Sequence, residues 1–302
     1  MKALVISGGG SKGAFAGGVA QYLIENKKHD YDIFIGTSTG SLLVSHLALK
    51  NVEKIKNVYT SVTQYAIFNS CPFLIKKKKG GIETIKISHL NVLKNILIGS
   101  KTFGESLNLK ALIRESITPA EFNKLKRSGK DIAVTVSNLS LNQVEYKSIK
   151  DFDYDEYCEW IWISCNYIPF MSLVKKDGCE YADGGLGSMI PIEEAIKRGA
   201  REVDAIILQT EVTQLNRMPS LNPFSLLTNM FAFMLDRIEA QNIKIGKFVA
   251  SNHEAIINFY YTPTVLTTNS LIFEKEKMLK WWQSGFEYAK FKNEAVSPLE
   301  KA

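Results

Sequence analysis

Two glycine-rich turns within the first forty residues constrain the fold of this chain more than any other feature. The first turn, at residues 8–13, directly follows an apolar run at 3–7, and the second, at 36–40, follows a similar run at 31–36. A helical pattern begins after each turn, with apolar residues recurring at helical spacing. Two successive strand–turn–helix units predict an α/β fold with a mostly parallel central sheet and helices on both faces.

The rest of the chain extends this pattern after an interruption. Residues 51–128 are mainly helical in pattern, and we interpret them as a helical insertion over the edge of the sheet. Further strands are expected at 131–137, 143–149, 178–182, 203–209 and 255–261. Helices are expected at 13–26, 39–50, 154–165, 221–249 (with a break near 243–246) and 273–292. The last helix places five apolar residues on one side: Met278, Leu279, Trp282, Phe286 and Ala289.

Nothing in the sequence marks a boundary between domains. No linker rich in Pro, Gly or Ser divides the chain, and the candidate site residues run from position 8 to position 185. We therefore expect residues 1–302 to form one domain, with a catalytic core at about 1–210 and the C-terminal helices and strand, 211–302, packed on it. A chain of 302 residues is within the range of a single large domain.

Composition and charge exclude several classes of protein. The first apolar run is short and ends in glycines, unlike a secretory signal, and no apolar stretch reaches the roughly 18 residues of a membrane span. The cysteines lack CxxC spacing and any metal-site pattern, so we expect free thiols in a cytoplasmic protein. A net charge of +6, from 37 basic and 31 acidic residues, is not the signature of a nucleic-acid-binding protein.

The second turn has the form of a nucleophile elbow. Its sequence, Gly36-Thr37-Ser38-Thr39-Gly40, places a serine between an apolar strand and the start of a helix, with small residues around it. A serine in this position is exposed at the C-terminal edge of the sheet, where the helix dipole favours its ionised form. The G-x-S-x-G pattern alone is weak evidence, and the alternative is an ordinary turn of small residues.

The first turn offers a row of main-chain N–H groups at the start of a helix, which suits a developing negative charge. Gly8, Gly10 and Gly13 also fit the dinucleotide-binding fingerprint G-x-G-x-x-G. That alternative needs an acidic residue at the far end of the second strand, whereas Asp30 and Asp32 lie at its near end. We therefore interpret the turn as an oxyanion hole.

A serine nucleophile needs a base, and the histidines offer no obvious one. His46 lies on the same predicted helix as Ser38, about 12 Å along its axis, which is too far for direct contact. The remaining histidines have no recognisable local setting, although a Ser-His-Asp triad stays open. Asp183, followed by two glycines after the short strand at 178–182, is another candidate, but Asp-Gly alone is typical of a hairpin turn.

Taken together, these motifs resemble those of the patatin-like phospholipases. The resemblance rests on three motifs in the family's order: the oxyanion loop Gly8-Gly9-Gly10-Ser11-Lys12-Gly13, the nucleophile elbow Gly36-Thr37-Ser38-Thr39-Gly40 and the catalytic Asp183-Gly184-Gly185. Residues 164–169 are similar to the family's serine-rich block, and Pro191 matches a proline that often follows the aspartate. The similarity covers about residues 1–210. It departs from the family within the block and just before the proline, at positions that shape the pocket.

The resemblance implies a three-layer patatin-like fold and a serine lipid acyl hydrolase of phospholipase A type. Ser38 would be the nucleophile and Asp183 the base, so that no histidine is needed. The oxyanion hole would be built from the first turn, which comprises Gly8, Gly9, Gly10, Ser11, Lys12 and Gly13. Gly36 and Gly40 would shape the elbow, and neither a metal nor a cofactor is implied.

The implied substrate is a phospholipid or another acyl lipid, which the protein would meet at the surface of a membrane. The apolar residues 72–75 and the four lysines that follow suit shallow insertion beside anionic headgroups, although a solvated loop is the alternative. Seven residues of the long C-terminal helix are candidates for an acyl channel or a lid: Phe224, Leu226, Leu227, Met230, Phe231, Phe233 and Met234. Such a stripe is also typical of a core helix.

Two other functions stay open from the sequence alone. One is a catalytically inactive lipid-binding or regulatory module of the same fold, against which the intact Ser38 and Asp183 argue. The other is a dinucleotide-binding protein, which titration with NAD(P) would reveal. The sequence predicts no particular protein partner.

Overall fold

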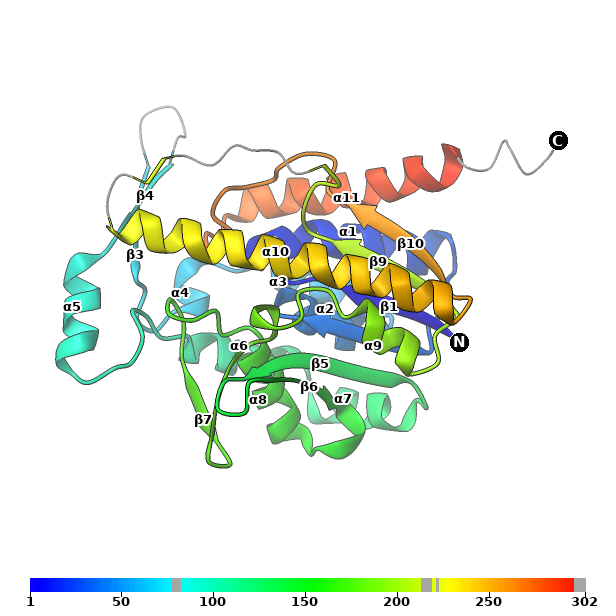
Figure 1. The fold of residues 1–302 in the computed structure, drawn as a ribbon, viewed down its shortest axis with the longest axis horizontal. Helices are drawn as coiled ribbons and strands as arrows, with labels where there is room; N and C mark the ends of the chain where they lie inside the picture. The colour runs from blue at the N-terminus through cyan, green and yellow to red at the C-terminus, as the bar shows by residue number, and fades with distance from the viewer. Residues whose placement is uncertain (78–82, 213–218, 221–222, 296–302) are drawn as a thin grey trace.

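Five parallel strands form the centre of the computed structural model, which describes residues 1–77, 83–212, 219–220 and 223–295 (Figure 1). In the order β10, β9, β1, β2, β5, they span Ile256–Tyr261, Glu202–Ile207, Lys2–Ile6, Ile33–Thr37 and Asp131–Asn138. Apolar residues predominate on both faces of β1 and β2, as expected for parallel strands covered by helices on both sides.

Three antiparallel strands continue the sheet around β5. β6 (Gln143–Ser148) and β8 (Cys179–Asp183) both pair with β5, and β7 (Val174–Lys176) pairs with β8. β6 occupies one edge of β5 over residues 133–138, so β2 and β8 share the other edge, one after the other. The C-terminal ends of β2 and β8 therefore meet beside the middle of β5.

Alternate residues of the central strands contribute to two hydrophobic cores. Leu4 and Ile6 of β1 point into the larger core, and Ala3 and Val5 point into the smaller one. The larger core includes residues of α1 (Gly13–Gln21, continued by a π-helical turn, Tyr22–Asn26), α2 (Thr39–Ala48), α3 (Val52–Ser61), α6 (Leu107–Ser116), α8 (Tyr154–Ser164) and α11 (Lys275–Ala295). The smaller core includes residues of α9 (Ile192–Lys197) and α10 (Pro223–Asn252). The three-layer α/β fold predicted from the sequence is thus confirmed.

The insertion at residues 51–128 is mainly helical, but it also contains a β-hairpin that the sequence pattern did not predict. Besides α3 and α6 it holds α4 (Gln64–Ile67), α5 (His89–Leu97), α7 (Pro119–Arg127) and the strands β3 (Phe73–Lys77) and β4 (Glu83–Ile87). Phe73 is buried and its ring stacks on that of Phe170, with centroids 5.7 Å apart. Of the segment expected to insert shallowly into a membrane, Leu74 is exposed, whereas Phe73 points inward. The side chains of the four lysines that follow lie outside the described residues.

Two expectations for the C-terminal helices are wrong. α10 is continuous through Gly246, because this glycine packs against α9: a Cβ at Gly246 would lie 2.8 Å from Cγ2 of Ile192. In α11, Met278 and Trp282 are buried as expected, but Leu279 is exposed.

Short 3₁₀ turns lie at Gly10–Lys12, Ile149–Asp151 and Gly184–Leu186. Within the described part of the chain, no helix is long and apolar enough to cross a membrane.

Candidate active site

Ser38 occupies a sharp turn between β2 and α2. Its backbone has φ 52° and ψ −118°, a conformation that is uncommon and strained for a serine. Glycine is required on both sides: a Cβ on Gly36 would collide with the backbone of Gly40, and a Cβ on Gly40 with the carbonyl group of Ile6. The turn has the strained strand–helix geometry of a nucleophile elbow.

Residues at the end of α8 hold the main chain of Ser38 in place. The N–H group of Ser38 donates a 3.0 Å hydrogen bond to Oγ of Ser164, and this hydroxyl donates to the carbonyl oxygen of Thr135 at 2.6 Å. The thiol of Cys165 donates to the carbonyl oxygen of Ser38 at 3.2 Å. Burial raises the pKa of this thiol well above its usual range. The block at 164–169 noted in the sequence therefore begins against the serine turn.

The strand register brings Asp183 to the same place. Thr37 pairs with Thr135, and Asp183 pairs with the next residue of β5, Val136. Asp183 is the last residue of β8, and its N–H group donates to the carbonyl oxygen of Asn166 at 2.9 Å. Ser38 and Asp183 thus meet where the two strands end.

The carboxyl group of Asp183 is removed from solvent beside Ser38. Asp183 is only 4% exposed, its carboxyl group lies near enough to the side chain of Ser38 for that hydroxyl to favour the ionised form, and Oδ1 accepts a 2.7 Å bond from the N–H group of Gly185. Burial raises the pKa of Asp183 to about 7, although the nearby hydroxyl of Ser38 and the N–H group of Gly185 oppose the shift by favouring the ionised form. This carboxyl group can therefore exchange a proton close to neutral pH.

The glycine-rich turn passes close to Ser38. A Cβ on Gly8 would lie 3.2 Å from Cβ of Ser38, so the absence of a side chain allows this approach. Several main-chain N–H groups of the turn already donate to carbonyl oxygens, namely those of Gly8, Ser11, Lys12 and Gly13. Among the described residues, no group accepts a hydrogen bond from the N–H of Gly9 or Gly10. These two donors are available to a ligand.

Lys12 points away from the bulk solvent. Its ammonium group donates a 2.5 Å hydrogen bond to the carbonyl oxygen of Leu208. Burial lowers the pKa of Lys12, while the nearby carboxyl groups of Glu239 and Asp236 oppose the shift. Lys12 therefore ties the turn to the end of β9 and carries its charge toward α10.

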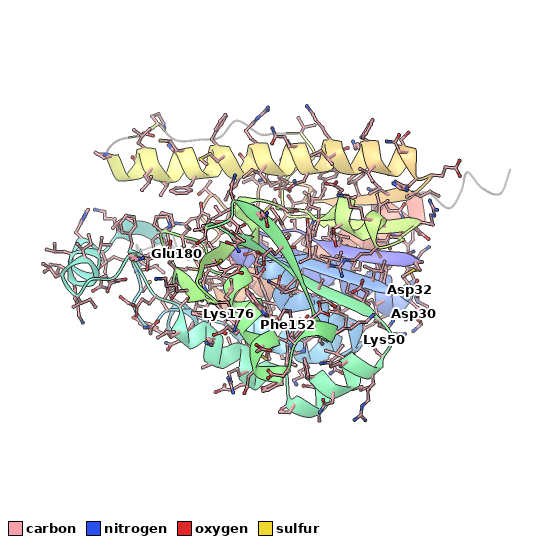
Figure 2. The ribbon with its side chains drawn as sticks, turned by 60° about the horizontal axis from the view of Figure 1, so that its bottom comes forward. Asp30, Asp32, Lys50, Phe152, Lys176 and Glu180 are labelled. Carbon is pink, nitrogen blue, oxygen red and sulfur yellow. The ribbon has the colours of Figure 1, made fainter. Side chains whose placement is uncertain are left out.

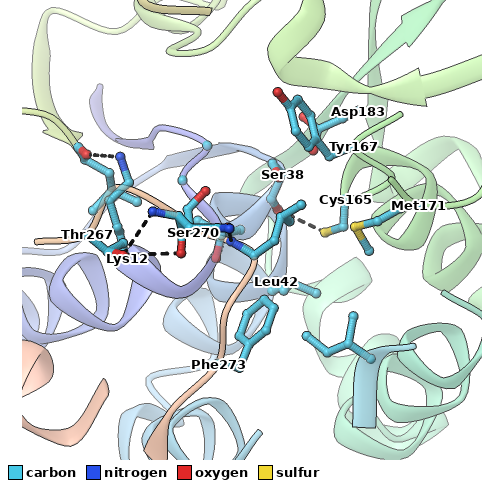
Figure 3. A pocket seen from close by; sticks show the side chains of 18 of the residues that line it. Lys12, Ser38, Leu42, Cys165, Tyr167, Met171, Asp183, Thr267, Ser270 and Phe273 are labelled. Carbon is cyan, nitrogen blue, oxygen red and sulfur yellow. Dashed lines mark hydrogen bonds between the residues drawn. The ribbon is translucent and has the colours of Figure 1, made fainter. Parts of the chain in front are cut away.

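Ser38 and Asp183 line a cavity of about 560 Å³, a volume typical of ligand-binding sites. Much of its wall is apolar and comes from α2 and from the insertion, including Leu42, Val58, Ile67, Leu112 and Ile113. In Figure 3, Met171 lies to the right of Ser38 and Leu42 below it, whereas Lys12 and Thr267 lie to its left. The cavity therefore has an apolar part and a polar part, with Ser38 between them.

The residues of α10 that line this cavity differ from those expected from the apolar stripe. The lining residues are Thr228, Asn229, Ala232, Leu235, Asp236 and Glu239. Of the expected channel residues, Leu226, Met230, Phe233 and Met234 are exposed, and Phe231 packs against Tyr167. The side chain of Phe224 lies outside the described residues. The acyl-channel expectation is wrong for this stripe because α10 turns its more polar face toward the cavity.

None of the four histidines lines the cavity. His46 is buried in α2, and burial lowers its pKa to about 4. Nδ1 of His29 lies 3.0 Å from Oδ2 of Asp204. His89 and His253 are exposed. Within the described residues, the group that reaches Ser38 is Asp183.

The acidic residues that a dinucleotide site would need lie elsewhere. Asp32 precedes β2, and its Oδ2 accepts a 2.8 Å hydrogen bond from the N–H group of Lys2. Asp30 forms ion pairs with Lys50 and Lys130. Figure 2 shows Asp30, Asp32 and Lys50 together at one end of the molecule. In the described part of the chain there is also no group of three or more His, Cys, Asp or Glu side chains that could hold a metal ion.

A family model described as patatin-like phospholipase matches residues 4–196. The chain belongs to this family. The matched segment runs from β1 into α9 and contains both Ser38 and Asp183. The family is described by an activity on phospholipids.

Two further similarities extend beyond the matched segment. The uncharacterized protein YjjU of Escherichia coli (strain K12) is 22% identical over 227 residues, which make up 72% of this chain and 54% of YjjU. The crystal structure of VipD from Legionella pneumophila has a TM-score of 0.50 at 16% sequence identity, over 96% of this chain and 66% of VipD. This chain therefore spans 54% of the length of YjjU and 66% of that of VipD. At such low identity the likeness to VipD shows the fold alone.

Two residues of the cavity wall were not predicted from the sequence. Ser270, in the loop before α11, accepts a 2.8 Å hydrogen bond from the N–H group of Ser11 through its carbonyl oxygen. Glu239 lies buried on α10 within a largely apolar helix. The one available signal is the pair Asp236 and Glu239, whose spacing of three residues puts two acidic side chains on one helix face.

Proposed function

We propose that the protein is a serine lipid acyl hydrolase of phospholipase A type, which cleaves acyl esters of phospholipids or related lipids. Ser38 is the nucleophile and Asp183 is the base. One observation carries the proposal: the strand register brings the buried carboxyl group of Asp183 beside Ser38, a serine on a strained turn, at the wall of a largely apolar cavity. Membership of the patatin-like phospholipases supports the lipid substrate.

In the first half-reaction, Oγ of Ser38 attacks the carbonyl carbon of the ester, and its proton passes to the Asp183 carboxylate. The carbonyl oxygen becomes an oxyanion, which the N–H groups of Gly9 and Gly10 stabilise. The bond from carbon to the alcohol oxygen then breaks. The alcohol leaves with the proton held by Asp183, and the acyl group stays on Ser38.

In the second half-reaction, Asp183 takes a proton from water as the water oxygen attacks the acyl carbon. The bond to Oγ of Ser38 breaks, Ser38 recovers the proton from Asp183, and the fatty acid is released. The N–H groups of Gly8, Ser11, Lys12 and Gly13 already donate hydrogen bonds to main-chain carbonyl oxygens. These four residues therefore contribute to the oxyanion hole by fixing the shape of the turn. Gly36 and Gly40 permit the elbow.

We also propose that the protein contacts membranes at their surface. Five apolar side chains of α5 and the residue after it are more than half exposed: Leu90, Leu93, Ile96, Leu97 and Ile98. Leu226, Met230, Phe233 and Met234 add exposed apolar side chains on the first half of α10. Figure 1 places α5 and the start of α10 at the same end of the molecule. Exposed apolar surface of this extent is typical of a site that binds lipid or protein.

The cavity supports the proposal that residues 1–302 work as one domain. Its wall combines the glycine-rich turn near the N-terminus with residues up to Phe273. The catalytic segment of about 1–210 would then depend on the C-terminal segment for a complete binding site.

Labelling by a fluorophosphonate probe, together with release of fatty acid from phospholipid vesicles, tests the assigned roles. Ser38→Ala should abolish both labelling and hydrolysis, and Asp183→Asn should abolish hydrolysis. A matched control is Asp177→Asn, in an exposed turn at φ 51°, a conformation that both Asp and Asn tolerate. Labelling that persists in Ser38→Ala, or hydrolysis that survives Asp183→Asn, would contradict the assignment. An unlabelled, inactive wild type would favour the lipid-binding module instead.

A further inference from the structure

The cavity continues past Ser38 into a polar part that the proposed chemistry does not use. It is lined by Lys12 from the glycine-rich turn, Gln209 after β9, Asp236 and Glu239 from α10, and Thr267 from the loop before α11. In Figure 3, Lys12 and Thr267 mark this part, on the far side of Ser38 from the apolar residues Leu42 and Met171. An ester bound with its acyl chain in the apolar part would extend its alcohol portion toward these polar groups.

Glu239 is the least satisfied group in this polar part. It is 3% exposed, and Oε1 has no hydrogen-bond partner among the described residues. Burial raises the pKa of Glu239 to about 7, with Lys12 opposing the shift. A buried carboxyl group without a partner destabilises a fold unless something else pairs with it. A ligand that donates hydrogen bonds is the simplest partner for a group that faces a cavity.

The neighbours of Glu239 are already engaged elsewhere. Oδ1 of Asp236 accepts a 2.7 Å hydrogen bond from Nε2 of Gln209. Lys12 uses one of its three donors on the carbonyl oxygen of Leu208, which leaves two for another group. The polar part therefore presents a positive charge with spare donors at Lys12 and an unpaired acceptor at Glu239.

These charges complement a ligand that carries both signs. We propose that the polar part binds the headgroup of a phospholipid whose phosphate is linked to a primary amine. The phosphate lies near Lys12 and the ammonium group donates to Glu239. This inference rests on the proposed function, since it takes the acyl ester to be at Ser38.

The chemistry of the wall favours a primary over a quaternary ammonium group. A trimethylammonium group has no N–H donor for Glu239, and its usual site is a cage of aromatic rings. Aromatic residues such as Tyr167 and Phe273 also line this cavity, so the discrimination rests on the N–H donors that a primary ammonium group offers to Glu239. A headgroup that ends in hydroxyl groups could donate to Glu239 but would lack the charge attraction.

Binding to the Ser38→Ala variant tests the headgroup independently of hydrolysis. The probes are three water-soluble dihexanoyl phospholipids with ethanolamine, choline or glycerol headgroups, titrated by calorimetry. We expect the ethanolamine lipid to bind about tenfold more tightly than the other two, as one charge-assisted hydrogen bond implies. Adding Glu239→Gln should remove this preference, whereas Glu115→Gln, an exposed site on α6, should keep it. Thermal melts of each variant check that the fold is retained.

Two results would overturn the inference. One is equal binding of all three lipids to Ser38→Ala. Glu239 is unaltered in this protein, so the result does not depend on whether a Glu239 variant folds. The other is an ethanolamine preference that survives Glu239→Gln in a folded variant. A different result would contradict the proposed function: the wild-type protein would neither react with a fluorophosphonate at Ser38 nor hydrolyse any of the three lipids.

Discussion

The main-chain N–H group of Gly185 donates a 2.7 Å hydrogen bond to Oδ1 of Asp183, two residues before it in the chain. This bond favours the ionised carboxylate, while burial favours the neutral acid and is the larger effect. The two influences leave the pKa of Asp183 at about 7. Both the activity and the stability of the protein should therefore change with pH near neutrality.

Activity should rise with pH through a single ionisation near pH 7. Asp183 accepts a proton only as a carboxylate, so kcat/KM should be low at pH 5 and reach a plateau above pH 8. A short-chain p-nitrophenyl ester, which is soluble and needs no membrane, suits the measurement. Asp177→Asn should show the wild-type profile, and a profile without an ionisation near pH 7 would contradict the role of Asp183.

Stability should respond to the same carboxyl group in the opposite direction. The pKa of Asp183 in the folded protein, about 7, lies above its ordinary value of 3.8, so the folded state holds a proton that the unfolded state releases. The free energy of unfolding should thus fall between about pH 4 and pH 7, by up to about 1.4 kcal/mol per pH unit. In Asp183→Asn this ionisation is absent. The free energy of unfolding measured in urea should therefore increase for the variant relative to wild type as the pH rises over this range. Since Glu239 titrates in a similar range, it is the difference between the two proteins that isolates Asp183.

Gly10→Ala should disable the oxyanion turn. Gly10 has φ +53°, and a Cβ there would collide with the carbonyl group of Ser270. We expect the rate of fluorophosphonate labelling to fall at least about tenfold, since the N–H of Gly10 would move away from the oxyanion position. Gly99→Ala is the matched control, because Gly99 has φ +80° with nothing within 4 Å, so it carries only the conformational cost of about 1–2 kcal/mol. Equal labelling of both variants would argue against a role for the turn.

Filling the apolar part of the cavity should shorten the acyl chain that the protein accepts. Leu112 on α6 lines this part, and Leu112→Trp adds bulk where the end of a long chain would lie. The ratio of hydrolysis rates for dodecanoyl and butanoyl p-nitrophenyl esters should drop about tenfold, equivalent to two methylene groups left unburied. Leu107→Trp, at a half-exposed site on the same helix, should leave the ratio unchanged. An unchanged ratio in Leu112→Trp would move the acyl chain elsewhere.

The exposed face of α5 should govern binding to vesicles. Leu97 is 77% exposed, and Leu97→Asp should weaken partitioning into phospholipid vesicles about tenfold through the loss of one buried leucine. Leu141→Asp changes an equally apolar residue, also exposed, in the turn between β5 and β6. Co-sedimentation with vesicles separates the two variants. Equal binding by both would place the membrane contact on another face.

Much of this fold can be predicted because its central units are local. The strand, glycine-rich turn and helix that begin the chain follow one another within about twenty residues, and each carries its own signal in apolar spacing and glycine. The β-hairpin in the insertion carries no comparable signal, since its strands are five residues long and form by pairing with each other. The break predicted near Gly246 is wrong because a tertiary contact overrides a local signal. Glycine alone weakens a helix, but here its close contact with Ile192 stabilises the helix.

The candidate site also contains residues that local sequence patterns reveal and residues that only the structure reveals. Ser38 and Gly10 belong to turns that the sequence reveals, and the pairing of Asp183 with Ser38 came from a family resemblance rather than from spacing. Their proximity depends on a register of β2 and β8 along β5 that no local pattern encodes. Glu239 could not be assigned to the cavity before the structure, because which face α10 turns toward the sheet is decided by packing.

The contact between Ser270 and the glycine-rich turn constrains the path of the main chain but not the side chain at position 270. Ser270 lies outside the segment that matches the family, yet its carbonyl oxygen holds the N–H group of Ser11. A main-chain carbonyl can be supplied by almost any residue, so the side chain at position 270 can change while the turn keeps its shape. Because Thr268 and Asn269 of the same loop line the cavity, side-chain changes there would alter the binding site while the contact that shapes the turn stays in place.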